Sequence, residues 1–155
     1  LVGSEMCIRD SPNTVANFIT LVEQGFYNKG MTFHRVVKDF VIQTGDPTKT
    51  GRGGPGYRIK DEVNARTHVA GAVGMAKTRR PNTAGSQFYI CLARMPERDG
   101  KYTVFGQVVK GLDVARKISF LPNTGPKGRP YPFKPKNPII IRNIEIIKVQ
   151  PQKEE

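Results

Sequence analysis

The chain has 155 residues, which is enough for one domain with its own core and too few to divide comfortably into two. Its composition is globular, with 37% apolar and 25% charged residues, and its 16 glycines and 12 prolines are more turn formers than a helical bundle tolerates. The formal net charge of +12 favours acidic partners such as nucleic acid, ribosomes or anionic lipid surfaces, but it indicates association and solubility rather than chemistry.

The first predicted element is a helix that begins at Pro12, with Ser11 as its N-cap, and ends before Gly25. Its apolar residues recur at helical spacing and form a stripe that must pack on another element: Val15, Phe18, Ile19 and Val22. A second, short helix is predicted over Leu112–Ile118.

Strands are predicted where apolar patterns of strand period lie between turn residues. A bent or hairpinned pair comes first, Thr32–Val37 and Phe40–Thr44, and the other predicted strands are Ala70–Ala76, Gln87–Leu92, Thr103–Val109 and Ile139–Val149. Several strands at a spacing of about ten residues, with one or two helices, predict a mostly β fold that is an all-β barrel or sandwich with helical plugs.

Two segments are predicted to be loops. Residues 48–58, TKTGRGGPGYR, hold too many glycines for a helix or a strand and would present backbone rather than side chains. Between Leu121 and Ile139 prolines recur among basic residues with no acid, which indicates an extended basic loop. The tail, residues 150–155, is expected to fray.

Targeting and metal-binding signals are absent from the sequence. No apolar run approaches the roughly 18 residues that a membrane span needs, and residues 1–10 lack the apolar core of a secretion signal. We therefore expect no membrane partner and a cytoplasmic location, unless a signal has been lost with the N-terminus. We also expect a monomer. Cys7 and Cys91 follow no zinc-ligand spacing and have only His34 and His68 to assist them, so we expect no metal and no cofactor, while a disulfide stays undecided.

Three stretches go beyond fold class: FHRVVKDFVIQTGD at Phe33–Asp46, PNTAGSQFYICLA at Pro81–Ala93 and DGKYTVFGQVVKGLDV at Asp99–Val114. Together they closely resemble the cyclophilins, which are peptidyl-prolyl cis/trans isomerases, and the resemblance runs in order from about Asn13 to Ile118. It implies a closed eight-stranded antiparallel barrel capped by two helices, here over residues 11–149, with a shallow substrate groove on its outer face.

The same resemblance implies the site residues. The catalytic arginine of the family falls on Arg35, with Gln43 beside it, and the substrate-binding residues fall on Phe40, Val41, Ala76, Gln87, Tyr89, Lys101 and Tyr102. Phe88 is expected in the core, because strand alternation places it on the face opposite Tyr89. The expected substrates are X-Pro bonds in proline-containing peptides and unfolded proteins, so the activity would assist protein folding.

The residue types suit this chemistry, because rotation about an X-Pro bond breaks no covalent bond and needs neither a nucleophile nor a metal. In the twisted amide the prolyl nitrogen regains its lone pair, so a fixed cationic donor stabilises the transition state. One edge of the planar Arg35 guanidinium can address the substrate while Gln43 holds another. A small apolar pocket of Phe40, Val41 and Tyr89 would grip the proline ring.

An alternative function is a non-catalytic module that binds proline-containing peptides and docks to RNA or ribosomes through basic loops such as Lys77–Arg80. His34 is expected to be structural, because the reaction removes no proton and alternation places this residue opposite Arg35. The adjacent Asp61 and Glu62 would point apart on a strand, and one of them is expected to order the glycine loop.

The sequence departs from the family at three places, of which one is the loop between Ala76 and Pro81, longer by one residue than usual. Residues 1–10 do not resemble the two opening strands of the barrel, so these strands are expected to be missing or replaced, as in a truncated or chimeric gene. At the downstream end of the groove, a Trp or His is common where this chain has Glu97, and an apolar residue where it has Arg98.

Overall fold

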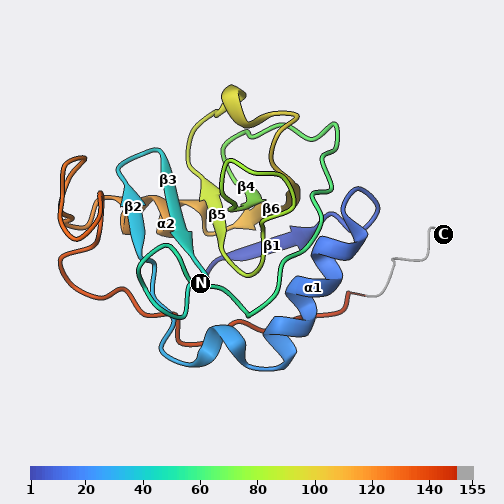
Figure 1. The fold of residues 1–155 in the computed structure, drawn as a ribbon, viewed down its shortest axis with the longest axis horizontal. Coiled ribbons are helices and arrows are strands. Elements are labelled where there is room, and N and C mark those ends of the chain that lie inside the picture. Colours follow the sequence, from blue (N-terminus) through green and yellow to red (C-terminus); the bar gives the residue numbers. More distant parts are fainter. Residues whose placement is uncertain (150–155) are drawn as a thin grey trace.

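The structure is a computed structural model and describes residues 1–149. Its strands form one antiparallel sheet with the order β1-β6-β4-β5-β3-β2 (Figure 1). The elements in chain order are β1 (Gly3–Met6), α1 (Pro12–Glu23), the 3-10 turn η1 (Phe26–Asn28), β2 (Arg35–Val37), β3 (Val41–Thr44), β4 (Ala72–Met75), β5 (Phe88–Cys91), the 3-10 turn η2 (Pro96–Arg98), β6 (Val104–Lys110) and α2 (Leu112–Ser119). Neither helix has the length and apolar character that a membrane crossing requires.

Both predicted helices are confirmed, and so are all the predicted strands except the last. The strand predicted over Ile139–Val149 is wrong. Ile140 makes a single bridge to Thr32, and beyond Ile141 no described backbone group joins a ladder. Alternation of apolar residues is not sufficient for a strand, because the backbone also needs a neighbouring strand to pair with.

The sheet is open, so the closed eight-stranded barrel is not observed among residues 1–149. Six strands are present, and β1 and β2 are the two edges. The expectation that both opening strands are missing is also corrected, because Gly3–Met6 forms β1 and pairs with β6 from Gly106 to Lys110. An edge strand pairs through backbone N–H and C=O groups, which almost every residue carries. The side chains of residues 1–10 therefore gave no indication that a strand forms there.

The predicted basic, proline-rich loop has no helix or strand and covers the β2 edge. Val36 in the middle of β2 donates its N–H to the Phe133 carbonyl at 3.0 Å, and its own carbonyl accepts from Asn123 Nδ2 at 3.2 Å. The Tyr131 hydroxyl donates to the Lys49 carbonyl at 2.7 Å. The loop therefore satisfies backbone groups of an edge strand that would otherwise be open to pairing.

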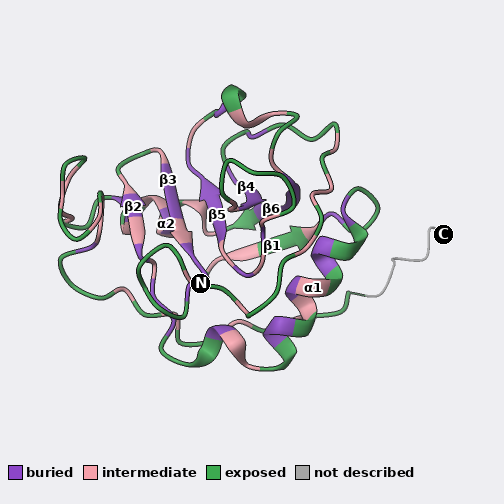
Figure 2. Cartoon of the chain, viewed as in Figure 1, coloured by how far each residue is buried: buried purple, intermediate pink, exposed green. Residues whose placement is uncertain are grey.

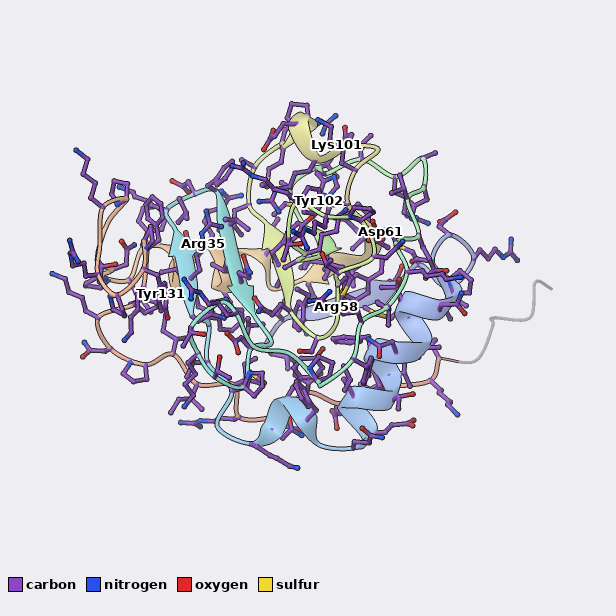
Figure 3. All side chains as sticks on the ribbon, viewed as in Figure 1. Arg35, Arg58, Asp61, Lys101, Tyr102 and Tyr131 are labelled. Atoms are coloured by element: carbon purple, nitrogen blue, oxygen red, sulfur yellow. The ribbon has the colours of Figure 1, made fainter. Side chains whose placement is uncertain are left out.

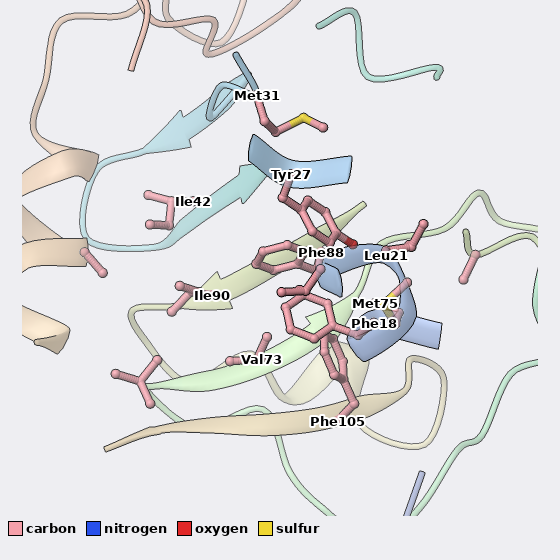
Figure 4. Close-up of a cluster of buried hydrophobic side chains, with 14 of the residues drawn as sticks. Phe18, Leu21, Tyr27, Met31, Ile42, Val73, Met75, Phe88, Ile90 and Phe105 are labelled. Atoms are coloured by element: carbon pink, nitrogen blue, oxygen red, sulfur yellow. The ribbon is translucent and has the colours of Figure 1, made fainter. Parts of the chain in front are cut away.

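Strands β3, β4 and β5 are buried along most of their length (Figure 2). The two faces of the sheet hold different clusters. One face packs on α1, where Phe88 makes an edge-on contact with Phe18 at 5.4 Å between ring centroids (Figure 4). The other face holds a smaller cluster whose buried members are Val41, Ala72, Tyr89, Cys91, Met95 and Val104. Phe88 and Tyr89 thus lie on opposite faces, which confirms the prediction from strand alternation.

The N-terminus of α1 is capped by a residue far away in the sequence. The predicted cap, Ser11, makes no side-chain bond to the helix and donates instead to the Cys7 carbonyl at 3.1 Å. The Glu62 carboxylate accepts from the backbone N–H groups of Asn13 at 3.2 Å and Thr14 at 2.5 Å. A carboxylate at this position also interacts favourably with the helix dipole, so Glu62 ties α1 to the segment that leads into β4.

Candidate functional site

A row of paired residues crosses the face of the sheet that lies opposite α1. Arg35 on β2 pairs with Gln43 on β3, Gln43 pairs with Tyr89 on β5, and Tyr89 pairs with Gly74 on β4. Directly paired residues present their side chains on the same face. The sheet register therefore brings together three residues that the sequence predicted for one site, and Figure 3 shows Arg35 at one end of the row, with Tyr102 and Lys101 toward the other.

Gly74 leaves space in this row for the Tyr89 ring. A Cβ atom at Gly74 would collide with the ring and hydroxyl of Tyr89. The Tyr89 hydroxyl is 2.8 Å from His68 Nε2, and His68 Nδ1 is 3.0 Å from an Asp99 oxygen. Sequence reasoning missed both residues, because the role of Gly74 depends on the register of the folded sheet and that of His68 on how the segment before β4 packs.

Arg35 is supported differently from our prediction. Its guanidinium carbon lies 5.8 Å from the ring centroid of Phe133, a residue of the basic loop. No hydrogen bond joins Arg35 to Gln43 among the described residues, and the bond that the Gln43 side chain does make is from Nε2 to Gln87 Oε1 at 3.0 Å. The prediction that Gln43 holds Arg35 is therefore wrong. Burial lowers the pKa of the Arg35 guanidinium, and the nearby Arg98 cation lowers it further.

Gln87 connects the site to the glycine loop at residues 48–58. Its Nε2 donates to the carbonyls of Gly51 at 3.1 Å and Gly53 at 2.8 Å, while its Oε1 accepts from Gln43. A hollow of about 560 Å³ lies beside this junction, and its lining includes three of the predicted site residues, Gln43, Ala76 and Gln87. The hollow adjoins the face of the sheet that carries the row, because Gln43 belongs to both.

The carboxylate that orders the glycine loop is Asp46, which corrects the expectation for Asp61 or Glu62. Asp46 Oδ1 accepts from the Thr48 N–H at 2.7 Å, and Oδ2 accepts from the N–H of Gly51 at 2.6 Å. Burial alone would raise the pKa of Asp46, but these hydrogen bonds and that of the Thr48 hydroxyl hold it below its usual range. Asp61 instead pairs with Lys77 at 2.9 Å.

The predicted apolar pocket is partly covered. Val41 and Tyr89 are each 0% exposed, whereas Phe40, Ala76 and Tyr102 are partly exposed. The guanidinium carbon of Arg98 lies 4.6 Å over the Tyr89 ring. Tyr89 therefore forms a floor beneath other side chains rather than an open wall, and its contact with a proline ring stays a prediction. The side chain of Lys101 is exposed at the rim.

The two cysteines are not paired with each other. Cys7 and Cys91 are both buried and free, and burial raises the pKa of the Cys91 thiol to about 12. Within residues 1–149 no group of His, Cys, Asp and Glu is arranged to hold a metal ion.

Comparisons with known proteins identify the family of this chain. The family model "Cyclophilin type peptidyl-prolyl cis-trans isomerase/CLD" matches residues 3–146. The chain belongs to this family. A peptidyl-prolyl cis-trans isomerase of Helicobacter pylori is 47% identical over 121 residues, covering 76% of this chain and 73% of the relative. One from Synechococcus elongatus is 54% identical over 111 residues, covering 70% and 75%.

Solved structures of cyclophilin-type isomerases also resemble this chain. A cyclophilin-type isomerase of Cryptosporidium parvum, crystallised in the presence of the dipeptide Ala-Pro, superposes with a TM-score of 0.85 at 33% identity. The superposition covers 96% of this chain and 93% of the other. The likeness spans residues before and after the three motifs, so the fold of the whole described chain, and not only its motifs, is that of a cyclophilin.

Phe133 should be a positioning residue for Arg35. We expect Phe133→Ala to lower kcat/KM for an X-Pro peptide about threefold to tenfold, because the ring beneath the guanidinium is lost and small misplacements of a catalytic group are costly. Phe133→Tyr should restore the activity. Phe120→Ala is the matched control, since it removes a ring beneath Lys38, away from the row. Equal losses in Phe133→Ala and Phe120→Ala would contradict the role.

The two histidines should make the cyclophilin less stable in mild acid. Burial is the main cause that lowers the pKa of both His34 and His68. The unfolded chain, with histidine pKa values of about 6.5, then binds more protons than the folded chain below that pH. We expect the free energy of unfolding, measured by urea titration, to fall as the pH decreases from about 7 to about 5.

His34 offers a direct control for this pH dependence. Neither of its ring nitrogens has a hydrogen-bond partner among the described residues, so His34→Leu removes a titrating group without breaking a bond. The slope of unfolding free energy against pH should become smaller in this variant. An unchanged slope would show that His34 does not contribute.

Proposed function

We propose that this cyclophilin catalyses the cis/trans interconversion of X-Pro bonds, with Arg35 as the group that stabilises the twisted amide. The observation that carries the proposal is the cross-strand row in which Arg35, Gln43 and Tyr89 share one face of the sheet. Arg35 is half-buried there and forms no ion pair with another described residue. Its charge is therefore free to act on a substrate.

The reaction needs a donor and an anchor. Planarity of the amide gives a rotation barrier of roughly 18–20 kcal/mol, and rotation transfers electron density to the prolyl nitrogen. A guanidinium N–H directed at that nitrogen is a stronger partner for the twisted amide than for either planar form. Partial burial strengthens the interaction, because less water screens the charge. Acceleration by five decades requires about 7 kcal/mol, and Arg35 supplies the largest share.

The anchor is the partly exposed apolar rim of Phe40, Ala76 and Tyr102 around the buried Val41 and Tyr89. It holds the proline ring while the preceding carbonyl swings. Gln43 presents the oxygen of its amide beside the hollow, where it can accept a hydrogen bond from the peptide backbone on one side of the proline. The amide of Gln87 is bonded to Gln43, Gly51 and Gly53, so this residue holds the glycine loop next to that contact. Contacts to the peptide backbone discriminate little between side chains of the substrate. The substrates we propose are therefore flexible proline-containing peptides and unfolded proteins.

A nucleic-acid partner for the basic loops stays a prediction, since no feature of the described residues favours it over exposed charge. Part of the loop at 121–139 already covers β2 and supports Arg35. Retention on immobilised RNA that weakens steeply with salt would support such a partner.

The activity is tested by NMR exchange spectroscopy on a short X-Pro peptide, which reports the rate of cis/trans interconversion at equilibrium. Catalytic amounts of the cyclophilin should raise the exchange rate well above the uncatalysed rate, whose time constant is tens to hundreds of seconds. An unchanged rate with folded protein would exclude the isomerase function. Binding of the peptide without any acceleration would favour the non-catalytic module instead.

A further inference from the structure

Arg98 places a second guanidinium over the aromatic rings of the candidate site. It is the last residue of η2, and its guanidinium carbon lies 4.6 Å over the Tyr89 ring and 4.8 Å over the Tyr102 ring. The ring of Tyr89 also abuts Gly74, so Gly74, Tyr89 and Arg98 form one packed group. The side chain is partly exposed, which leaves part of the cation accessible from solvent.

The charge of Arg98 has no partner within residues 1–149, whereas neighbouring cations do. Lys77, whose Nζ lies 5.3 Å from the Tyr102 ring, pairs with Asp61 at 2.9 Å. Arg94 pairs with Asp99. No carboxylate of the described chain forms an ion pair with Arg98, although Glu97 and Asp99 adjoin it in sequence.

Arg35, on the face of the sheet that carries the row, also forms no ion pair with another described residue. The field of Arg98 contributes to the lowered pKa of Arg35, after burial. Two guanidinium groups that repel each other in a partly buried groove favour an anion between or beside them. A guanidinium lying over aromatic rings keeps N–H groups at its edge for a carboxylate, which it can bind through two parallel hydrogen bonds.

We propose that Arg98 is a specificity-determining residue that binds a carboxylate side chain of the substrate, so that this cyclophilin prefers peptides with an acidic residue adjacent to the proline. The proposal rests on the proposed isomerase function and names its substrate class. The adjacent position follows from the packing of Arg98 on Tyr89, the floor of the site where the proline ring is expected. A carboxylate farther along the peptide would lie beyond this group.

The test compares peptides that differ only in charge. Glutamate or glutamine is placed immediately before or immediately after the proline, and kcat/KM is measured by exchange spectroscopy for each peptide. The wild-type protein should prefer glutamate over glutamine at one or both positions by about fivefold, the size expected of a partly exposed ion pair with good geometry. Added salt should reduce this preference.

Two variants assign the preference to Arg98. Arg98→Leu should make the glutamate and glutamine peptides equal, because the apolar side chain still covers Tyr89 but carries no charge. Arg142→Leu is the matched control: Arg142 is exposed outside the site, and its replacement should leave the preference as in wild type. Equal rates for glutamate and glutamine in the wild type would overturn the proposal.

Two further outcomes would also overturn it. If Arg98→Leu raises kcat/KM by the same factor for all peptides, Arg98 covers Tyr89 and does not discriminate between charged and neutral substrates. If the preference survives in Arg98→Leu, another cation is responsible. Affinities of the same peptides, measured by NMR titration, separate this proposal from the isomerase function. Tighter binding of glutamate peptides that depends on Arg98, without faster exchange, would reject catalysis and retain the carboxylate site.

Discussion

Replacing Arg35 by alanine should lower kcat/KM for X-Pro isomerisation by about two to three orders of magnitude, the usual cost of removing a donor that acts on the transition state. The loss should lie mainly in kcat, because the interaction with the prolyl nitrogen exists only in the twisted amide. The fold should persist, since no described hydrogen bond or ion pair involves the Arg35 side chain. Exchange spectroscopy gives the rate, and circular dichroism with urea titration checks the fold.

Lysine at the same position separates charge from geometry. Arg35→Lys keeps the cation but loses the planar group with its several N–H donors, and the ammonium is more strongly hydrated. We expect an activity between those of the wild type and Arg35→Ala. An Arg35→Ala protein that is folded and within a few-fold of wild-type activity would show that the twisted amide is stabilised elsewhere. Equal activity of Arg35→Lys and wild type would show that charge alone is sufficient.

The part of the site that lies on strands could be predicted, because it follows from patterns within short stretches of the sequence. Alternation placed Phe88 and Tyr89 on opposite faces, and the resemblance in the motif from Phe33 to Asp46 identified Arg35 and Gln43 together. The structure adds that these residues are directly paired across β2 and β3. Two strands joined by a short connection fix their own register, so a sequence motif that spans both carries most of this information.

The parts that could not be predicted depend on contacts between distant segments. Phe133 reaches Arg35 because the basic loop happens to cover the β2 edge, and no pattern in a proline-rich segment indicates which residue will face inward. Glu62 replaced Ser11 as the cap of α1 for the same reason. Arg98 was recognisable as unusual by its charge, but its position over two aromatic rings follows only from the packing of η2.

Phe88→Ala should have the largest effect on stability. The Phe88 ring is 6% exposed and touches Phe18, Tyr27 and Phe105, with centroid distances of 5.4, 5.5 and 6.3 Å. Removing it loses buried apolar surface and leaves a cavity that the sheet and α1 cannot close, which typically costs about 3–5 kcal/mol. This is a large fraction of the roughly 5–15 kcal/mol that stabilises a folded domain. The midpoint of urea unfolding gives the loss.

Phe120 provides the matched control for that loss, because it is the same residue type and is 51% exposed. Phe120→Ala should cost less than about 1 kcal/mol, as surface substitutions usually do. Similar losses in Phe88→Ala and Phe120→Ala would mean that the core does not lie between the sheet and α1. Activity gives an independent check: Phe88 lies on the face opposite Arg35, so Phe88→Leu, which fills most of the space, should lose stability while the folded protein keeps its kcat/KM. One face of the sheet then stabilises the fold and the other carries the candidate site, because Phe88 and Tyr89, which are adjacent on β5, lie on opposite faces.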